Sequence, residues 1–123
     1  METVRNTYKI YDNSELGEVQ ISDDVLAVIS AMAAMEVDGV VAMAGNVTTE
    51  IVAKLGMKKL SKGVRVDVDE NTVMLDLSIV LRMNENIIQI SKKVQDKVKT
   101  TVENMTGMKV ANVNVNISNV LSN

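Results

Sequence analysis

The chain has 123 residues, of which 46% are hydrophobic and 24% are charged, and its formal net charge is −3. This length predicts one domain, and the acidic balance argues against a general nucleic-acid-binding protein, which carries a strong basic excess. The absence of His and Cys excludes zinc sites built from these residues and nucleophilic centres that need a thiol or an imidazole. We therefore expect no catalytic residues, no metal site and no cofactor.

The N-terminal segment, residues 1–16, mixes charged residues, Asn and both Tyr of the chain without a hydrophobic period. We expect a flexible tail there, followed by a single domain over residues 17–120. No stretch approaches the roughly 18 to 20 consecutive apolar residues of a membrane span, and the N-terminus has no apolar signal region. The expected location is the cytoplasm, with membrane contact only peripheral or through a partner.

The first part of the domain predicts a strand, a helix and a second strand. Residues 18–21 alternate in polarity, and Ser22 is a favourable N-cap for a helix that reaches about Met35. A short apolar run over residues 40–44 follows as the next strand. The buried stripe of the helix is expected at three- and four-residue spacing, at Val25, Val28, Ile29 and Met32.

Residues 48–62 form a lysine-rich connector, in which a short helix is expected to break near Gly56. One interpretation is a solvated connector, because charge runs are commonly solvated faces. The other is a basic amphipathic segment that engages an acidic partner or a membrane surface. The candidate partner-binding residues of the connector are Lys54, Lys58, Lys59 and Lys62.

The second part of the domain predicts a hairpin, a long helix and a last strand. Residues 64–69 and 73–82 alternate in polarity around the turn-forming Asp69-Glu70-Asn71, which is typical of a β-hairpin. The helix is expected over residues 85–105, before Gly107. Its apolar stripe is expected at Ile87, Ile90, Val94, Val98, Val102 and Met105. The last strand is expected to place Val113, Val115 and Ile117 on one face and Asn112, Asn114 and Asn116 on the other.

The element order is therefore strand-helix-strand-connector-hairpin-helix-strand. Two helices with one apolar stripe each, over strands with one apolar face each, predict an α+β fold, a two-layer α/β sandwich.

Three surface features carry alternative interpretations. The asparagine row is either a wet sheet face or a contact between protomers, because amides can hydrogen-bond across an interface. The acidic turn can hold a hard cation in principle, but it lacks the glycine-punctuated loop of a calcium hand; its residues are Asp67, Asp69 and Glu70. The basic face of the long helix is expected to be solvated rather than bound to nucleic acid, because aromatic stacking residues are absent; its residues are Lys92, Lys93, Lys97 and Lys99.

Five short motifs follow one another along the chain: Gly17-Glu18-Val19-Gln20-Ile21-Ser22, Glu36-Val37-Asp38-Gly39-Val40, Ser61-Lys62-Gly63-Val64-Arg65-Val66, Met105-Thr106-Gly107-Met108-Lys109-Val110 and Val113-Asn114-Val115. In their order and spacing, these motifs resemble the alkaline-shock protein family of Gram-positive bacteria. The resemblance covers residues 17–120, although the connector is less glycine-rich than the family leads us to expect. It implies an abundant, non-enzymatic cytoplasmic protein of cell-envelope homeostasis. Some relatives gather near the membrane through a membrane-anchored partner, and others are associated with control of fatty-acid synthesis.

Three hypotheses follow from the residues and the resemblance together. The first is an interaction or scaffold module of the envelope stress response, which forms a homo-oligomer and binds a membrane-linked protein partner. The second is a regulator that binds a fatty-acid or lipid-synthesis enzyme. The third is a lipid or small-molecule binder that uses the gap between the helices and the sheet.

Overall fold

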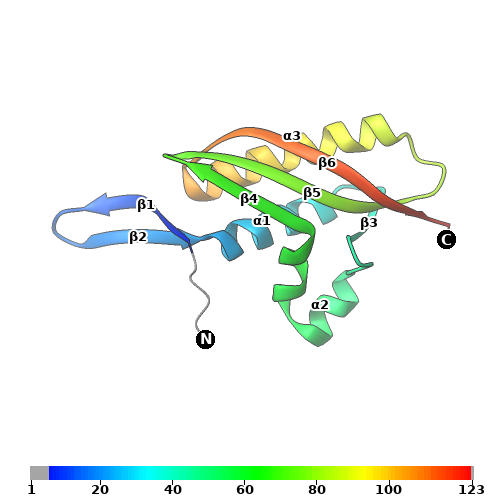
Figure 1. Ribbon diagram of the computed structural model, residues 1–123, viewed down its shortest axis with the longest axis horizontal. Coiled ribbons are helices and arrows are strands. Elements are labelled where there is room, and N and C mark those ends of the chain that lie inside the picture. The colour runs from blue at the N-terminus through cyan, green and yellow to red at the C-terminus, as the bar shows by residue number, and fades with distance from the viewer. Residues whose placement is uncertain (1–5, 123) are drawn as a thin grey trace.

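A computed structural model describes residues 6–122, except for the side chains of Thr49, Met57 and Lys58. The elements run along the chain as β1 (Thr7–Asn13), β2 (Gly17–Ser22), α1 (Asp23–Met35), β3 (Val40–Met43), α2 (Thr49–Leu55), the 3₁₀ helix η1 (Met57–Gly63), β4 (Val64–Asp69), β5 (Thr72–Arg82), α3 (Ile87–Thr106) and β6 (Lys109–Leu121). Helices α1 and α3 contact each other and lie on the same side of the main sheet (Figure 1). The two-layer α+β fold predicted from the sequence is confirmed.

Strand β5 is the centre of the main sheet. It pairs with β6 in parallel along one edge and with β4 and β3 in antiparallel along the other. The parallel pair is possible because α3 supplies the crossover connection that parallel strands require. Residues of β5 alternate between the two faces: Val73, Leu75 and Leu77 are buried under the helices, whereas Asp76 is exposed on the opposite face. The sheet therefore has one face in the core and one open face.

Several local predictions are confirmed. The β4–β5 hairpin turns at Glu70 and Asn71, and Glu70 has a positive φ of 57°. Ser22 caps α1, because its side chain accepts a hydrogen bond from the backbone N–H of Val25. Gly107 ends α3 in the left-handed conformation, with φ of 74°, which glycine adopts without a Cβ penalty.

The predicted buried stripe of α1 is wrong. Val25 and Met32 are 47% and 42% exposed, and the helix instead buries Leu26, Ala27, Ser30, Ala31, Ala33 and Ala34. Small side chains let α1 approach α3, the sheet and η1 closely, so the alanine-rich face packs better than the larger apolar stripe. On α3 the interior of the predicted stripe is buried, but Ile87 and Met105 at its ends are exposed.

Residues 7–13, which we expected within the flexible tail, form strand β1. It pairs with β2 in a separate two-stranded sheet, so β2 does not join the main sheet. This hairpin projects from one end of the molecule (Figure 1). Its root is attached by Tyr8, whose hydroxyl donates a 2.6 Å hydrogen bond to the Asp23 carboxylate at the start of α1. Burial and the neighbouring Asp23 raise the pKa of Tyr8 from 10.0 to about 12.

Candidate functional site

The lysine-rich connector folds into α2 and η1, which separate at Gly56 as predicted. Thr48 caps α2 by accepting a hydrogen bond from the backbone N–H of Ile51, and the apolar side chains of Ile51 and Leu55 face the segment that follows β3. The result is an open groove of about 330 Å³ between the end of β3 and the connector. We call it the basic-rimmed groove; it is lined by Ala44, Gly45, Val47, Ile51, Leu55, Lys59 and Lys62.

The described residues that line this groove include two charged side chains, Lys59 and Lys62, and both are positive. Among the described residues, no carboxylate forms an ion pair with Lys59 or Lys62. Lys54 is exposed on α2 and is not among the lining residues, and the side chain of Lys58 lies outside the described part of the chain. An apolar floor beside two unpaired ammonium groups can hold an apolar side chain together with a carboxylate.

The asparagine row lies on the open face of the sheet, beside β5. Asn114 donates a 2.7 Å hydrogen bond to Asp76, and Asn116 a 3.4 Å one to Ser78. Asn112 stands opposite Met74 in the same register. These amides therefore use part of their hydrogen-bonding capacity within the chain.

A second groove, of about 220 Å³, lies next to both candidate regions. Its lining includes Lys62 and Arg65, together with Asp76 and Ser78, the two hydrogen-bond partners of the asparagine row. Lys62 lines both grooves. The connector and the hydrogen-bond partners of the asparagine row therefore lie close together.

The part of this surface that residues 44–47 and β4 contribute was not predicted from the sequence. Val47 packs as a wall of the basic-rimmed groove because it forms an isolated bridge with Met43. Arg65 reaches the surface because it pairs in register with Asp76. The alternation over residues 64–69 placed Arg65 on the wet face, but only the pairing of β4 with β5 brings it beside Asp76.

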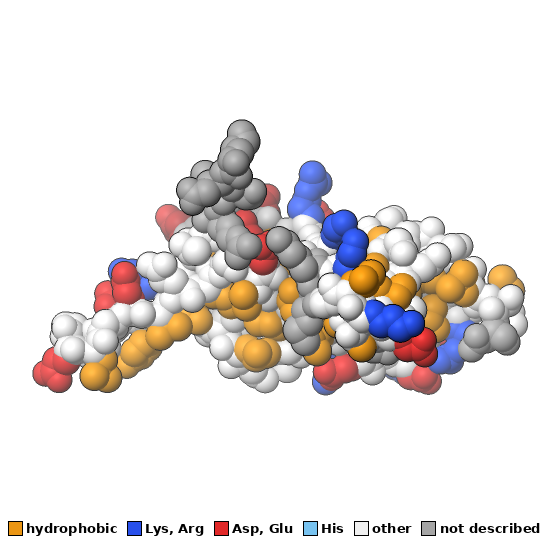
Figure 2. Space-filling model, turned by 90° about the horizontal axis from the view of Figure 1, so that it is seen from below, with side chains coloured by type: hydrophobic (Ala, Val, Ile, Leu, Met, Phe, Trp, Pro, Cys, Tyr) orange, Lys and Arg blue, Asp and Glu red, His pale blue; other side chains and the backbone are white. Residues whose placement is uncertain are grey.

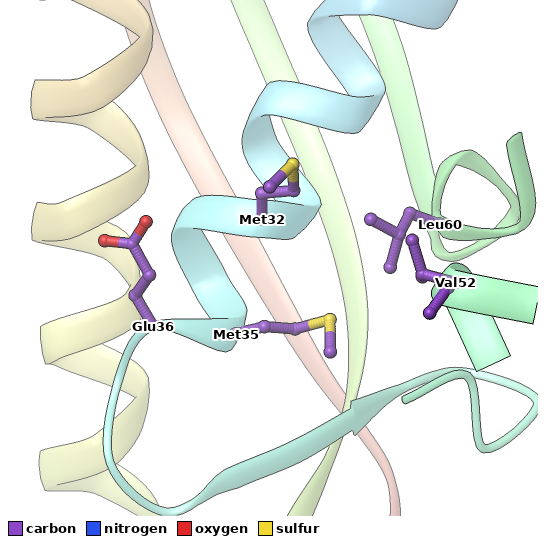
Figure 3. Close-up of a pocket in the computed structure, with 6 residues that line it drawn as sticks. Met32, Met35, Glu36, Val52 and Leu60 are labelled. Atoms are coloured by element: carbon purple, nitrogen blue, oxygen red, sulfur yellow. The ribbon is translucent and has the colours of Figure 1, made fainter. Parts of the chain in front are cut away.

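A separate apolar groove, also of about 330 Å³, lies between α1 and the connector. Met32 and Met35 of α1 face Val52 and Leu60 across it (Figure 3). Glu36 is the one charged residue among the described residues that line it, and it points away toward α3, where its carboxylate lies 3.1 Å from the Lys97 ammonium. We call this the α1 groove.

Two further features show no ligand-binding arrangement. Within residues 6–122, no three acidic side chains converge as a metal site would require. The basic face of α3 is partly engaged inside the chain, because Lys97 pairs with Glu36 and Lys99 donates to the Val110 carbonyl.

A family model described as "Asp23 family, cell envelope-related function" matches residues 11–122; the name is unrelated to residue Asp23 of this chain. The chain belongs to this family. The resemblance to alkaline-shock proteins is thereby confirmed, and with it a cell envelope-related function.

Relatives of known sequence agree with this assignment. Protein YqhY of Bacillus subtilis is 34% identical over 87% of this chain and 79% of its own length. Protein YloU of the same species is 30% identical over 87% of this chain and 91% of its own length. The stress response regulator gls24 homolog of Streptococcus pyogenes is 27% identical over 95% of this chain and 66% of its own length.

Among solved structures, a variant of the MamM C-terminal domain aligns with a TM-score of 0.47 and 12% identity, over 80% of this chain and 93% of its own. At that TM-score the likeness does not bear on function. Among the helices of residues 6–122, none is long and apolar enough to cross a membrane.

Proposed function

We propose that this protein is a non-enzymatic interaction module of the cell envelope stress response, which acts in the cytoplasm and binds a membrane-linked protein partner. The partner segment that fits is a short stretch with apolar side chains and at least one carboxylate. The proposal also includes association between copies of the chain.

The basic-rimmed groove is the observation that carries the proposal. Its floor is apolar, and Lys59 and Lys62 at its rim have no ion-pair partner among the described residues. Unpaired cations beside an apolar surface are typical of sites that recognise acidic partners. The family's cell envelope-related function supports a partner at the membrane.

A protein segment fits this groove better than a lipid surface or a nucleic acid does. A volume of about 330 Å³ accommodates a few side chains, and the described residues that line the groove include two lysines, fewer than the cluster of four to eight that recognises anionic lipid. The net charge of −3 opposes adsorption on either polyanion.

Photo-crosslinking at one position of the groove tests the proposal. A benzophenone amino acid replaces Leu55, which is 62% exposed and lines the groove, and the protein is irradiated with membranes from its native cells. The matched control position is Ile88, which is 64% exposed at the start of α3 and lines none of the three grooves described above.

We expect a linked membrane protein from position 55 only, and its loss in a Lys59→Glu/Lys62→Glu background. Equal linkage from both positions, or linkage that persists after charge reversal, would contradict the proposal. A lipid-synthesis enzyme linked at position 55 in place of a membrane protein would keep the groove as a binding site but refute the membrane link.

A further inference from the structure

The β1–β2 hairpin has one charged face and one apolar face. Lys9 on the charged face is 3.3 Å from Asp12 and 3.1 Å from Glu18, so these charges neutralise one another within the hairpin. Tyr11 and Val19 are direct cross-strand partners, and partners in an antiparallel pair project from the same face. Both side chains are exposed, as is Leu16 at the tip.

The exposed side chains of Tyr11, Leu16 and Val19 form an apolar ridge on the hairpin, and this ridge continues onto α1. Val25 and Met32, seven residues apart on one side of the helix, are exposed, and Ile29 between them is half-buried. Figure 2 shows hydrophobic side chains following one edge of the hairpin and continuing onto the body of the molecule. A helix that is apolar on every side is normally buried on every side, so the exposed stripe of α1 indicates a surface that a partner covers.

We infer that the partner is a second copy of this chain. The hairpin of each copy lies along helix α1 and the α1 groove of the other copy. This inference rests on the self-association included in the proposed function, and it assigns the surface and its geometry.

Complementarity of charge and shape favours a second copy over another occupant. The ridge is uncharged, and the α1 groove is lined by apolar residues apart from Glu36, which is paired with Lys97. The ridge is convex and the groove is concave, and both belong to one chain. The hairpin projects outward from the body, away from α2 (Figure 1), so it does not fill the groove of its own chain.

Lengths and symmetry also agree. The seven residues of β1 and the thirteen of α1 each span about 20 Å, at about 3.3 Å per strand residue and 1.5 Å per helix residue. The exposed apolar residues run from Val19 on the hairpin through Val25 to Met32 on α1. A two-fold axis that passes near Val25, perpendicular to this row, places Val19 of each copy over Met32 of the other. Such a reciprocal contact is the contact of an isologous interface. A separate two-stranded hairpin is marginally stable in water, and this contact would stabilise it.

Sedimentation equilibrium of the full chain tests the inference. We expect the wild type to form a two-copy species that dissociates on dilution. Val19→Asp on the ridge and Met32→Asp beside the groove should each weaken association roughly tenfold or more, because each would bury a charge. Ile88→Asp is the control, since Ile88 is exposed at the start of α3. A wild type that stays a single copy at every concentration, or equal weakening by the control, would overturn the inference.

Cysteine crosslinking tests the geometry, because the chain contains no Cys. Val19→Cys and Met35→Cys proteins are treated with a short bis-maleimide, separately and mixed. Linked pairs are expected in the mixture only, and linkage of Val19→Cys to itself would overturn the placement of ridge in groove.

Binding to native membranes is measured alongside for the wild type and Val19→Asp. A single-copy wild type that binds membranes contradicts this inference alone, whereas a two-copy wild type that does not bind them contradicts the partner-binding proposal alone.

Discussion

The Tyr8 hydroxyl lies 2.6 Å from the Asp23 carboxylate and donates a hydrogen bond to it. Asn6 adds a second tie, because its carbonyl accepts from the backbone N–H of Asp23 at 3.0 Å. Asp23 also lies in the first turn of α1, where a negative charge is favoured by the helix dipole. The Asp23 carboxylate therefore favours the first turn of α1 and also connects the projecting hairpin to the body.

Loss of this hydrogen bond should destabilise the hairpin. We expect Tyr8→Phe to lower the free energy of unfolding by about 1 kcal/mol. A hydrogen bond to a charged group contributes more than a neutral one, but the partial exposure of Tyr8 reduces this contribution. Urea denaturation measures this difference. The control is Tyr11→Phe, which removes only a 3.5 Å contact with Asn13 and should change nothing; equal effects of the two substitutions would refute the role of Asp23.

The pKa of Tyr8 makes the same attachment sensitive to alkali. The pKa is raised from 10.0 to about 12 in the folded protein, so the folded state holds the phenolic proton more tightly than the unfolded chain does. The resulting stability is complete below pH 10 and is lost as the pH rises from 10 toward 12. Absorbance of tyrosinate in a Tyr11→Phe background measures the titration of Tyr8 alone. A midpoint near 10 would contradict the arrangement.

The packed face of α1 can be tested with two truncations of similar chemistry. Leu26 is fully buried and Val25 is largely exposed. We expect Leu26→Ala to cost about 2–5 kcal/mol because it leaves a cavity, and Val25→Ala to cost about 0.5 kcal/mol or less. Thermal and urea denaturation are compared at a concentration where sedimentation shows single copies. A larger loss of stability from Val25→Ala than from Leu26→Ala would show that α1 buries the face predicted from the sequence, which contains Val25.

A side chain at Gly39 should destabilise the fold. Its φ is 103°, and an added Cβ would lie 2.8 Å from Ile90 Cδ1 and 3.3 Å from Ile90 Cγ1. Gly17 has a similar φ of 112° but open space around it, so it is a matched control for backbone strain alone. Gly39→Ala should cost roughly 1 kcal/mol more than Gly17→Ala because of the added overpacking. If urea denaturation gave equal losses of stability for Gly39→Ala and Gly17→Ala, the Ile90 side chain would have moved aside without an energetic cost, and the overpacking would be refuted.

Local signals in the sequence predicted the secondary structure well. Alternation over residues 64–82 predicted the β4–β5 hairpin, and the caps at Ser22 and Gly107 predicted helix ends, because these features depend on neighbouring residues alone. The face that α1 buries was not predictable in this way. Both of its sides carry apolar residues, and the choice between them depends on how closely α3 and the sheet approach.

The candidate site was predictable only in part. The lysines of the connector were found from composition, and the asparagine row from its alternation. Their meeting along one surface depends on Arg65 and Asp76 pairing in register and on β5 lying between β4 and β6. The strand β1 was missed because residues 7–13 lack a clean alternation: the register shifts between Lys9 and Tyr11, where a bulge interrupts the strand.

Co-sedimentation with membranes tests the central claim most directly. Purified protein is mixed with native membranes, with the same membranes after protease treatment, and with liposomes made from their extracted lipids. We predict that the wild type sediments with untreated membranes only, and that Lys59→Glu/Lys62→Glu does not sediment, whereas Lys92→Glu/Lys93→Glu, on the exposed face of α3, sediments as the wild type does. Binding to the liposomes, or undiminished binding of the Lys59→Glu/Lys62→Glu protein, would contradict a membrane-linked protein partner at the basic-rimmed groove.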